Sequence, residues 1–467
     1  MTPTLDRRPP RRPVGAALAA LLALALAPGC STVGSLIPRL STGPQPGQPG
    51  YVRGFLGGVA AEEPRAALVA REVLSAGGSA TDAAVAAGLT LAVTLPSRVG
   101  LGGGGACLVF EPNRRSGAEA VVFPAGARSG ALPSGTDRPA AVPMLARGLF
   151  ALHTRGGRRP FEELIAEAER LARLGTPVSR ALAQDLAAVR GPLFADPGAR
   201  AIFARPDGTP LGEGDRLVQP DLAATLTTMR ISGVGDLHQG ALARRLAEAS
   251  VRAGGGLTLD ALRDGVPQIL PAVQFPAGND VVAFLPPQAD GGFGAAAEAW
   301  RRGGGDPTRI LSGGAVAGGG GAPLGASTAL VTLDRDGGAV ACAFSMNNLF
   351  GTGRVAQGTG ILLGAAPNIG AVAPAPLAAA LAGNANLRAF RAAVAGSGQQ
   401  VAPGAVAATM AQILRGAAPA QAIAAAAPEP ARVVAIGCSR YLPGFADSCA
   451  VASDPRGAGA ALGGSER

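Results

Sequence analysis

The sequence predicts a fold of layered helices and strands, of either the α/β or the α+β class. Segments with helical periodicity alternate with strand-like segments along most of the chain, and such blocks must bury their apolar faces against one another. Apolar residues make up 48% of the 467 residues, which is enough for a large core. Because aromatic residues make up only 4%, alanine, valine and leucine must build that core.

The N-terminal segment has the features of an export signal. Arginines concentrate between residues 7 and 12, an apolar run covers residues 14–27, and small residues follow at Pro28-Gly29-Cys30. Such a short apolar run predicts a signal peptide over residues 1–29 rather than a membrane span. Cys30 after Gly29 resembles a bacterial lipoprotein cleavage box, which predicts lipidation of Cys30. An ordinary secretory signal with an incidental cysteine is the alternative.

Residues 30–56 are expected to form a low-complexity tether, because serine, proline and glycine are abundant there. We therefore expect an exported, periplasmic protein that a lipid anchor attaches to the membrane of the bacterial envelope. The net charge of +9 does not indicate a nucleic-acid partner, because the basic residues are scattered arginines without interleaved aromatic residues.

Two helices are predicted after the tether. The first begins at Glu62-Glu63-Pro64, where acidic residues and proline suit a helix N-terminus, and it ends at Gly77-Gly78. The second begins at Thr81-Asp82 and ends at Leu95-Pro96. Its alanine-rich sequence is apolar on nearly all faces, so we expect it to be buried.

The rest of the chain continues the alternation of helices and strands. A glycine loop at residues 100–105 precedes a strand-like segment at 106–110, and residues 139–262 are mostly helical in pattern. Residues 269–284 read as strands, followed by a rigid turn from Pro286-Pro287 to Gly294. Residues 303–325 are rich in glycine and expected to be flexible. Two adjoining strands are then predicted at 327–334 and 338–346.

Cysteine usage fits an oxidising compartment. Cys438 and Cys449 lie close together in a C-terminal loop and could form a disulfide. Cys107 and Cys342 lie in apolar runs and are expected to be inert core residues rather than nucleophiles. The cysteines and histidines do not have the spacing of a metal site, so we expect no metal.

Histidine-dependent catalysis is poorly supported. The only histidines are His153, after an apolar helix face, and His238, in a loop of Gly, Asp and Gln, and both are expected to be structural. This argues against a Ser-His-Asp triad and against metal-assisted hydrolysis. An enzyme with this sequence needs a nucleophile that works without histidine.

Self-cleavage would supply such a nucleophile at Ser327. A glycine-rich segment, a serine and a buried strand follow one another at Gly325-Ala326-Ser327-Thr328 and beyond. The hydroxyl could attack the carbonyl of Ala326. The freed α-amine, with an unperturbed pKa of about 7.7–8.0, could then act as the base. From the pattern alone, an ordinary serine at a strand edge is the alternative.

An ordered set of motifs resembles the γ-glutamyltransferase family and covers most of the chain from about residue 57. The motifs are Gly57-Gly58-Val59-Ala60-Ala61, Gly77-Gly78-Ser79-Ala80-Thr81-Asp82, Leu101-Gly102-Gly103-Gly104-Gly105, Gly212-Glu213-Gly214-Asp215-Arg216-Leu217, Ser327-Thr328, Phe350-Gly351-Thr352-Gly353, Gly358-Thr359-Gly360 and Ser453-Asp454-Pro455-Arg456.

The resemblance implies an α+β fold, a four-layer αββα sandwich of the N-terminal-nucleophile hydrolase type. It implies a precursor that is cut between Ala326 and Ser327. The cut divides the domain into a large-subunit-like part, residues 57–326, and a small-subunit-like part, residues 327–467, which stay paired. The implied activity is transfer or hydrolysis of γ-glutamyl groups on small-molecule amides such as glutathione, without an organic cofactor.

The resemblance also assigns roles to single residues. Ser327 stands in place of the family's nucleophilic threonine, and Ser345 matches a hydroxyl residue near the nucleophile's amine. Asn347 matches an asparagine that holds the substrate's α-amino group. Gly398, in Gly396-Ser397-Gly398, is the nearest match to the glycines of the oxyanion hole.

The sequence departs from the family where the substrate's charged groups bind. The arginine clamp for the α-carboxylate aligns with Pro124, and the serine pair for the same group aligns with Ala378-Ala379. The paired acidic residues align with Asn368-Ile369, and the segment between Trp300 and Ser327 is short for the family. A zwitterionic glutamyl group would therefore meet an apolar surface.

Two hypotheses follow. The first is a self-cleaving amidohydrolase or acyltransferase that depends on Ser327 and has a diverged, less charged acyl pocket. The second is a non-catalytic envelope lipoprotein that keeps the fold for binding. An uncut chain favours the second, because a blocked Ser327 amine cannot act as a base.

Overall fold

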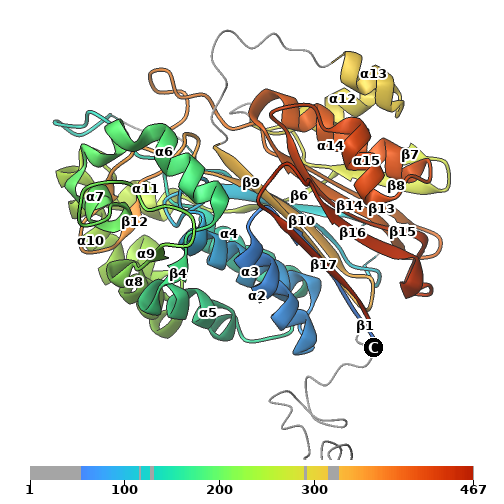
Figure 1. The fold of residues 1–467 in the computed structure, drawn as a ribbon, viewed down its shortest axis with the longest axis horizontal. Coiled ribbons are helices and arrows are strands. Elements are labelled where there is room, and N and C mark those ends of the chain that lie inside the picture. The colour runs from blue at the N-terminus through green and yellow to red at the C-terminus, as the bar shows by residue number, and fades with distance from the viewer. Residues whose placement is uncertain (1–53, 115–116, 127–130, 289–291, 314–325, 466–467) are drawn as a thin grey trace, which may run out of the picture. The chain divides into compact units, whose positions relative to one another are not determined.

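Two large antiparallel sheets form the centre of the fold (Figure 1). The computed structural model describes residues 54–465 apart from residues 115–116, 127–130, 289–291 and 314–325. The predicted signal peptide, Cys30, nearly all of the predicted tether and most of the glycine-rich segment before Ser327 lie outside the described residues. Within the described residues, no helix has the length and apolar character needed to cross a membrane.

The first sheet has seven strands in the order β17-β1-β9-β10-β2-β3-β6. They are β1 (Phe55–Ala61), β2 (Gly104–Phe110), β3 (Glu119–Phe123), β6 (Gln268–Pro271), β9 (Ser327–Asp334), β10 (Ala339–Ser345) and β17 (Ala460–Ser465). The hairpin of β9 and β10 confirms the two strands predicted there. Its neighbours β1 and β2 come from much earlier in the chain, so this sheet unites both predicted subunit-like parts.

The second sheet has six strands in the order β16-β15-β14-β13-β8-β7. They are β7 (Val273–Ala277), β8 (Asp280–Phe284), β13 (Ala378–Asn384), β14 (Ala389–Ser397), β15 (Arg432–Leu442) and β16 (Cys449–Ser453). Small apolar side chains from both sheets, such as Ala341 and Ala393, form one buried cluster between them. Because alternate residues of each strand are apolar on this inner face, the sheets pack against each other.

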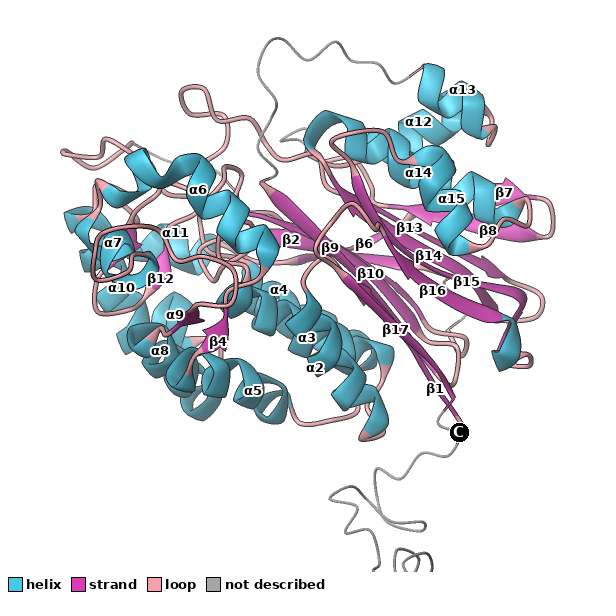
Figure 2. Ribbon diagram, in the orientation of Figure 1, coloured by secondary structure: helices cyan, strands magenta, loops and turns pink. Residues whose placement is uncertain are grey.

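Helices cover the outer face of each sheet (Figure 2). The first sheet is covered by α2 (Pro64–Ser75), α3 (Ala80–Thr94) and α4 (Leu145–Gly156), with α5 (Phe161–Leu174) packed on α3. The second is covered by α12 (Ala295–Gly303), α14 (Ala402–Leu414) and α15 (Pro419–Ala426), with α13 (Pro307–Ser312) packed on α12 and α14. Separate apolar clusters fill each helix–sheet interface. The four-layer αββα architecture is thus confirmed.

Six more helices fill the middle of the chain, as the helical pattern there predicts. They are α6 (Arg180–Phe194), α7 (Pro197–Phe203), α8 (Pro220–Ser232), α9 (Asp236–Gln239), α10 (Ala241–Arg252) and α11 (Leu259–Asp264). The remaining short elements are β4 (Thr176–Pro177), β5 (Arg216–Leu217), β11 (Val355–Ala356), β12 (Ile361–Leu362) and the 3₁₀ turns η3 (Gln399–Val401) and η4 (Ala446–Ser448).

Helix α3 confirms the predicted buried helix, and every one of its residues is buried. Its N-terminus lies slightly earlier than predicted, because Ser79 caps it. The Ser79 hydroxyl accepts from the Asp82 N–H, and Asp82 Oδ2 accepts from the Ser79 N–H, which satisfies two helix-end donors. This reciprocal cap explains how a helix with no polar face begins at a defined residue.

The prediction of a loop at His238 is wrong. His238 lies in α9 and is fully buried, and its Nδ1 is 3.0 Å from the carbonyl oxygen of Leu262. Burial lowers the pKa of His238 to about 4, so the ring is neutral near pH 7. His153, in α4, places Nε2 2.7 Å from the carbonyl oxygen of Arg159. Both contacts are structural in kind.

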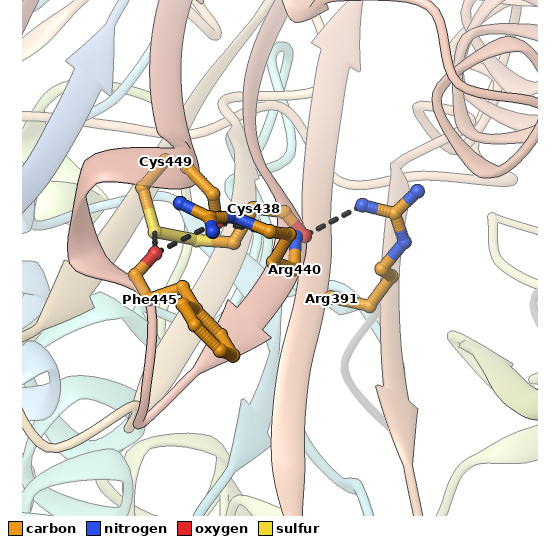
Figure 3. Close-up of a disulfide and its surroundings, with 6 residues drawn as sticks. Arg391, Cys438, Arg440, Phe445 and Cys449 are labelled. Carbon is orange, nitrogen blue, oxygen red and sulfur yellow. Dashed lines mark hydrogen bonds between the residues drawn. A yellow bond between two sulfur atoms is a disulfide. The ribbon is translucent and has the colours of Figure 1, made fainter.

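The structure joins Cys438 in β15 to Cys449 in β16 through a disulfide, the pairing expected from the sequence (Figure 3). Arg391 of β14 donates to the carbonyl oxygen of Cys438, and the Arg440 guanidinium lies over the Phe445 ring. The disulfide therefore fastens the outermost strand of the second sheet to its neighbour.

A second disulfide was not predicted. Cys107 and Cys342 are fully buried, as expected of core residues, but they form a disulfide with each other. They lie directly opposite one another in the ladder between β2 and β10. Because they are 235 residues apart in the chain, no local sequence pattern predicts this pairing.

Candidate active site

Ser327 and Ser345 lie opposite each other at one end of the first sheet. Ser327 is the first residue of β9, Ser345 is the last residue of β10, and the two are register partners. Gly104 of β2 is the next partner along, opposite Ser345. Both serines are only 3% exposed. The hairpin predicted from the sequence thus brings together two of the predicted site residues.

Strand periodicity places both serines on the inner face of the first sheet. Ala329, Val331 and Leu333 of β9 belong to the apolar cluster between the sheets, as does Ala343 of β10. Because side chains alternate between the faces of a strand, Ser327 shares the face of Ala329 and Ser345 shares the face of Ala343. The two hydroxyl residues therefore lie where the first sheet meets the second.

Ser345 contacts the peptide bond at which cleavage is predicted. Its hydroxyl donates to the carbonyl oxygen of Ala326 at 2.8 Å and accepts from the N–H of Asn347 at 2.8 Å. A donor on this oxygen stabilises the negative charge that develops there when a nucleophile attacks the carbonyl carbon. The contact thus suits Ser345 to activating the bond between Ala326 and Ser327.

The side chain of Asn347 is occupied by backbone partners. Its Nδ2 donates to the carbonyl oxygens of Ala125 and Ala365, both at 2.9 Å, and its Oδ1 accepts from the Ala375 N–H at 3.4 Å. Asn347 also has a positive φ of 64°, which asparagine tolerates better than most residues. A substrate amine could use only the second acceptor site of Oδ1.

Gly398 follows β14 in the second sheet, close to Glu62. Its φ is +125°, and an added Cβ would lie 2.5 Å from the Cα of Ala431, so the position requires glycine. Ser397, the preceding residue, donates from its hydroxyl to Glu62 Oε2 at 2.7 Å. Ser397, Gly398 and Glu62 line a cavity of about 180 Å³ together with Arg98 and Arg432.

Glu62 is a candidate functional residue that was not predicted from the sequence. The prediction that Glu62-Glu63 form a helix N-terminus is correct for Glu63, whose carboxylate accepts from the N–H groups of Arg65 and Ala66. Glu62 instead is buried at the end of β1, where desolvation raises its pKa to about 7. An acidic residue directly after an apolar strand was the available signal.

The pocket at the diverged clamp positions is small, and its lining is uncharged as far as the described residues show. Pro124 lines it with Ala125, Ser345, Asn347 and other residues, none of them ionisable, and its volume is about 20 Å³. Ala379 is buried in the cluster between the sheets. Asn368 and Ile369 lie in a turn in which Asn368 is exposed. These positions offer no counter-charges for a zwitterion.

The raised pKa of Glu62 leads to a prediction about stability. Between about pH 4.5 and 7 the folded protein binds this proton more tightly than the unfolded chain, so Glu62 makes stability fall as pH rises through that window. We expect Glu62→Gln to flatten the decline in melting temperature between about pH 5 and about pH 8. Thermal unfolding of the parent, Glu62→Gln and the exposed control Glu162→Gln would measure this. Equal declines in all three would contradict it.

No group of three or more His, Cys, Asp or Glu side chains arranged to hold a metal ion occurs among the residues that the structure describes.

Comparisons with known proteins point to one family. Residues 66–298 match the family model of gamma-glutamyltranspeptidase. Glutathione hydrolase 3 of Arabidopsis thaliana is 32% identical over 254 residues, which cover 51% of this chain and 39% of that protein. Glutathione hydrolase 6 of Homo sapiens is 33% identical over 63% of this chain and 55% of its own length. The chain thus spans about half the length, or less, of these relatives.

The fold also resembles a solved structure over nearly its full length. The crystal structure of cephalosporin acylase from Bacillus halodurans superposes with a TM-score of 0.68, covering 91% of this chain and 99% of that chain. The two are 19% identical, so the likeness concerns the fold.

Proposed function

Because this chain belongs to the γ-glutamyltranspeptidase family, we propose that it is a self-cleaving amidohydrolase or acyltransferase with Ser327 as its nucleophile. The observation that carries the proposal is the contact between Ser345 and the Ala326 carbonyl oxygen, 2.8 Å apart, directly opposite Ser327 in the sheet. The proposed activity depends on the maturation of this one site.

Maturation begins with attack of the Ser327 hydroxyl oxygen on the carbonyl carbon of Ala326. The oxygen–carbon bond forms as the carbon–nitrogen bond breaks, and the proton of the hydroxyl ends on the released amine, which leaves an ester. Ser345 donates to the carbonyl oxygen while it carries negative charge. Water then hydrolyses the ester, which gives a carboxylate on Ala326 and restores the hydroxyl of Ser327, whose α-amine is already free.

The same hydroxyl then serves an external amide. The α-amine, with an unperturbed pKa of about 7.7–8.0, takes the hydroxyl proton as Ser327 attacks the substrate carbonyl. The α-ammonium passes this proton to the substrate nitrogen, the amine of the substrate leaves, and the acyl group stays on Ser327 as an ester. Water then produces an acid, or an acceptor amine produces a new amide.

We propose a less charged acyl group than γ-glutamyl as the substrate. The pocket of about 20 Å³ beside Ser345, whose described lining residues are not ionisable, and the alanines at 378 and 379 support this. A buried carboxylate or ammonium without a partner is strongly disfavoured, which selects against a zwitterion in such a pocket. The same features support the second candidate, a non-catalytic envelope protein that binds through this fold.

A substrate screen tests the proposed acyl preference. We expect hydrolysis of neutral N-acyl amides to exceed that of glutathione, because the clamp positions supply no counter-charges. Ser327→Ala is the matched control, since activity that survives it comes from a contaminant. If the parent turns over none of the amides in a Ser327-dependent manner, the proposed activity is wrong.

A second prediction concerns Ser345. Ser345→Ala should slow self-cleavage by about a hundredfold, the typical cost of removing one donor to an oxyanion. Ser345→Thr retains the hydroxyl and should cleave at nearly the parent rate. Time courses on denaturing gels after cell-free synthesis would measure both rates. Equal rates for Ser345→Ala and the parent would show that the contact with Ala326 has no role.

We also propose that the protein is exported and anchored to the envelope through a lipid on Cys30. The N-terminal signal pattern supports this, and the two disulfides suit an oxidising compartment. Incorporation of a labelled fatty acid into the parent but not into Cys30→Ser would test the anchor. Label in both proteins would exclude Cys30.

A further inference from the structure

Glu62 is a buried carboxylate that connects the two sheets at the end where Ser327 lies. Its backbone N–H donates to the carbonyl oxygen of Ala329 in β9 at 3.2 Å. Its Oε2 accepts from the Ser397 hydroxyl in the second sheet at 2.7 Å and from the Thr328 hydroxyl at 3.4 Å. One carboxylate thus contacts the residue after the candidate nucleophile and the residue before Gly398.

The surroundings satisfy this carboxylate only in part. Arg98 Nη1 lies 3.9 Å from Oε2, but its Nε and Nη2 donate to Asp185 at 2.8 and 2.9 Å. Oε1 is buried and has no hydrogen-bond partner among the described residues. A buried acceptor without a hydrogen-bond partner lowers the stability of the fold. Such a group is more typical of a functional residue than of a stabilising one.

We propose that Glu62 is a positioning residue for the reaction of Ser327, acting through the hydroxyls of Thr328 and Ser397. Thr328 shares a peptide group with Ser327, so a hydrogen bond that fixes Thr328 also fixes the direction of the attacking hydroxyl. Ser397 adjoins Gly398, so the same carboxylate sets the distance between the start of β9 and the turn in the second sheet. The inference rests on the proposed function, because it concerns the nucleophile of that reaction.

The charge on Glu62 changes the strength of both hydrogen bonds. An ionised acceptor makes shorter and stronger hydrogen bonds than a neutral one. Desolvation raises the pKa of Glu62 to about 7, opposed by the charges of Arg98 and Arg432 and by the hydrogen bonds from Ser397 and Thr328. The rate of self-cleavage should therefore change through the neutral pH range as the Glu62 carboxyl group loses its proton.

The rate of self-cleavage against pH tests this role. The chain would be made by cell-free synthesis, transferred to buffers across the neutral range, and followed on denaturing gels. Glu62→Gln should be about tenfold slower, the loss expected when one charge-assisted hydrogen bond disappears, and should lack the inflection near pH 7. Glu63→Gln is the matched control, since Glu63 is also buried but contacts neither Thr328 nor Ser397 in the structure.

The outcomes separate this inference from the proposed function. A profile for Glu62→Gln that superimposes on the parent's overturns the positioning role while leaving self-cleavage intact. A parent chain that never cleaves overturns the proposed function itself. If Glu62→Gln does not fold, Thr328→Val removes the partner hydroxyl at similar volume. It should slow cleavage and shift the inflection, and an unchanged profile would again overturn the role.

The disulfide between Cys107 and Cys342 carries a second, independent inference. Cys107 lies in the large-subunit-like part and Cys342 in the small-subunit-like part, on either side of the proposed cut after Ala326. They face each other across adjacent strands in the buried interior. We infer that this disulfide links the two chains covalently after cleavage. The inference therefore also rests on the proposed self-cleavage.

The link requires oxidation before or during folding, because both sulfur atoms are buried afterwards. The two thiols lose two electrons and two protons, and an oxidised thiol–disulfide oxidoreductase is reduced to its dithiol in exchange. The second disulfide, between Cys438 and Cys449, lies entirely within the small-subunit-like part. It serves as an internal control, because it cannot link the chains.

Denaturing electrophoresis with and without reductant tests the link, with free thiols alkylated beforehand. We expect the parent to give one band without reductant and two bands with it. Cys342→Ser should give two bands in both conditions, whereas Cys438→Ser should behave like the parent. Two bands from the unreduced parent would overturn the inference. One band under reduction would overturn self-cleavage. A peptide map of the non-reduced parent would then show only whether Cys107 and Cys342 form a disulfide.

Discussion

Ser327→Ala should leave the chain completely uncut, whereas the parent should yield two chains, the second beginning at Ser327. Alanine lacks the hydroxyl oxygen that attacks Ala326. Among the described residues, the serine opposite it in the sheet, Ser345, already donates to the same carbonyl oxygen. The measurement is the intact mass of the reduced, purified protein. Amide hydrolysis should be lost together with cleavage, since the α-amine base is never released.

Ser327→Thr and Ser327→Cys are the matched variants. Both retain a nucleophilic atom at the same position, and threonine also restricts the χ1 rotation that serine leaves free. We expect both variants to cleave. A parent that remains one uncut chain would contradict the proposed maturation and would favour the non-catalytic alternative. Cleavage of Ser327→Ala at the same bond would show that another group, or a protease, makes the cut.

Asp334→Ala should produce the largest loss of stability among the changes considered. Asp334 is 1% exposed, and its carboxylate accepts from the N–H groups of Ala80, Asp336 and Gly338 at 2.9–3.0 Å. Alanine leaves these donors without partners at the N-terminus of α3 and in the turn between β9 and β10. Hydrogen bonds to a charged group are worth about 1.5–3 kcal/mol each, so we expect a loss of about 3 kcal/mol.

Thermal unfolding would show this loss as a fall in melting temperature of about 3–4 °C. Asp334→Asn retains one acceptor oxygen and should lose less. Asp336→Asn is the surface control, because Asp336 is half exposed and pairs with Arg158, a contact typically worth less than about 1 kcal/mol. A fall for Asp334→Ala no greater than that for Asp336→Asn would contradict the assigned role.

The two predictions are connected through one hairpin. Asp334 fixes the turn between β9 and β10, and the far ends of those strands carry Ser327 and Ser345. A register error at the turn would move every side chain of a strand to the opposite face. Asp334→Ala protein that remains folded should therefore also cleave more slowly.

Much of the fold was predictable from the sequence because its signals are local. The order of the main elements, the buried helix after Ser79 and the hairpin from residue 327 follow from caps, turn residues and apolar periodicity within short windows. Even the closeness of Ser327 and Ser345 follows from that hairpin, since residues at matching distances from a turn become register partners.

The tertiary structure alone decided how distant segments meet. Cys107 and Cys342 form a disulfide because β2 and β10 are neighbours in the sheet. The apolar run around each cysteine does not predict which strand will lie beside it. Glu62 is desolvated because β1 ends beside β9 and β14, whereas the chain around it reads only as the start of a helix. Periodicity and capping act between near neighbours in the chain, but burial and register depend on which strands pair.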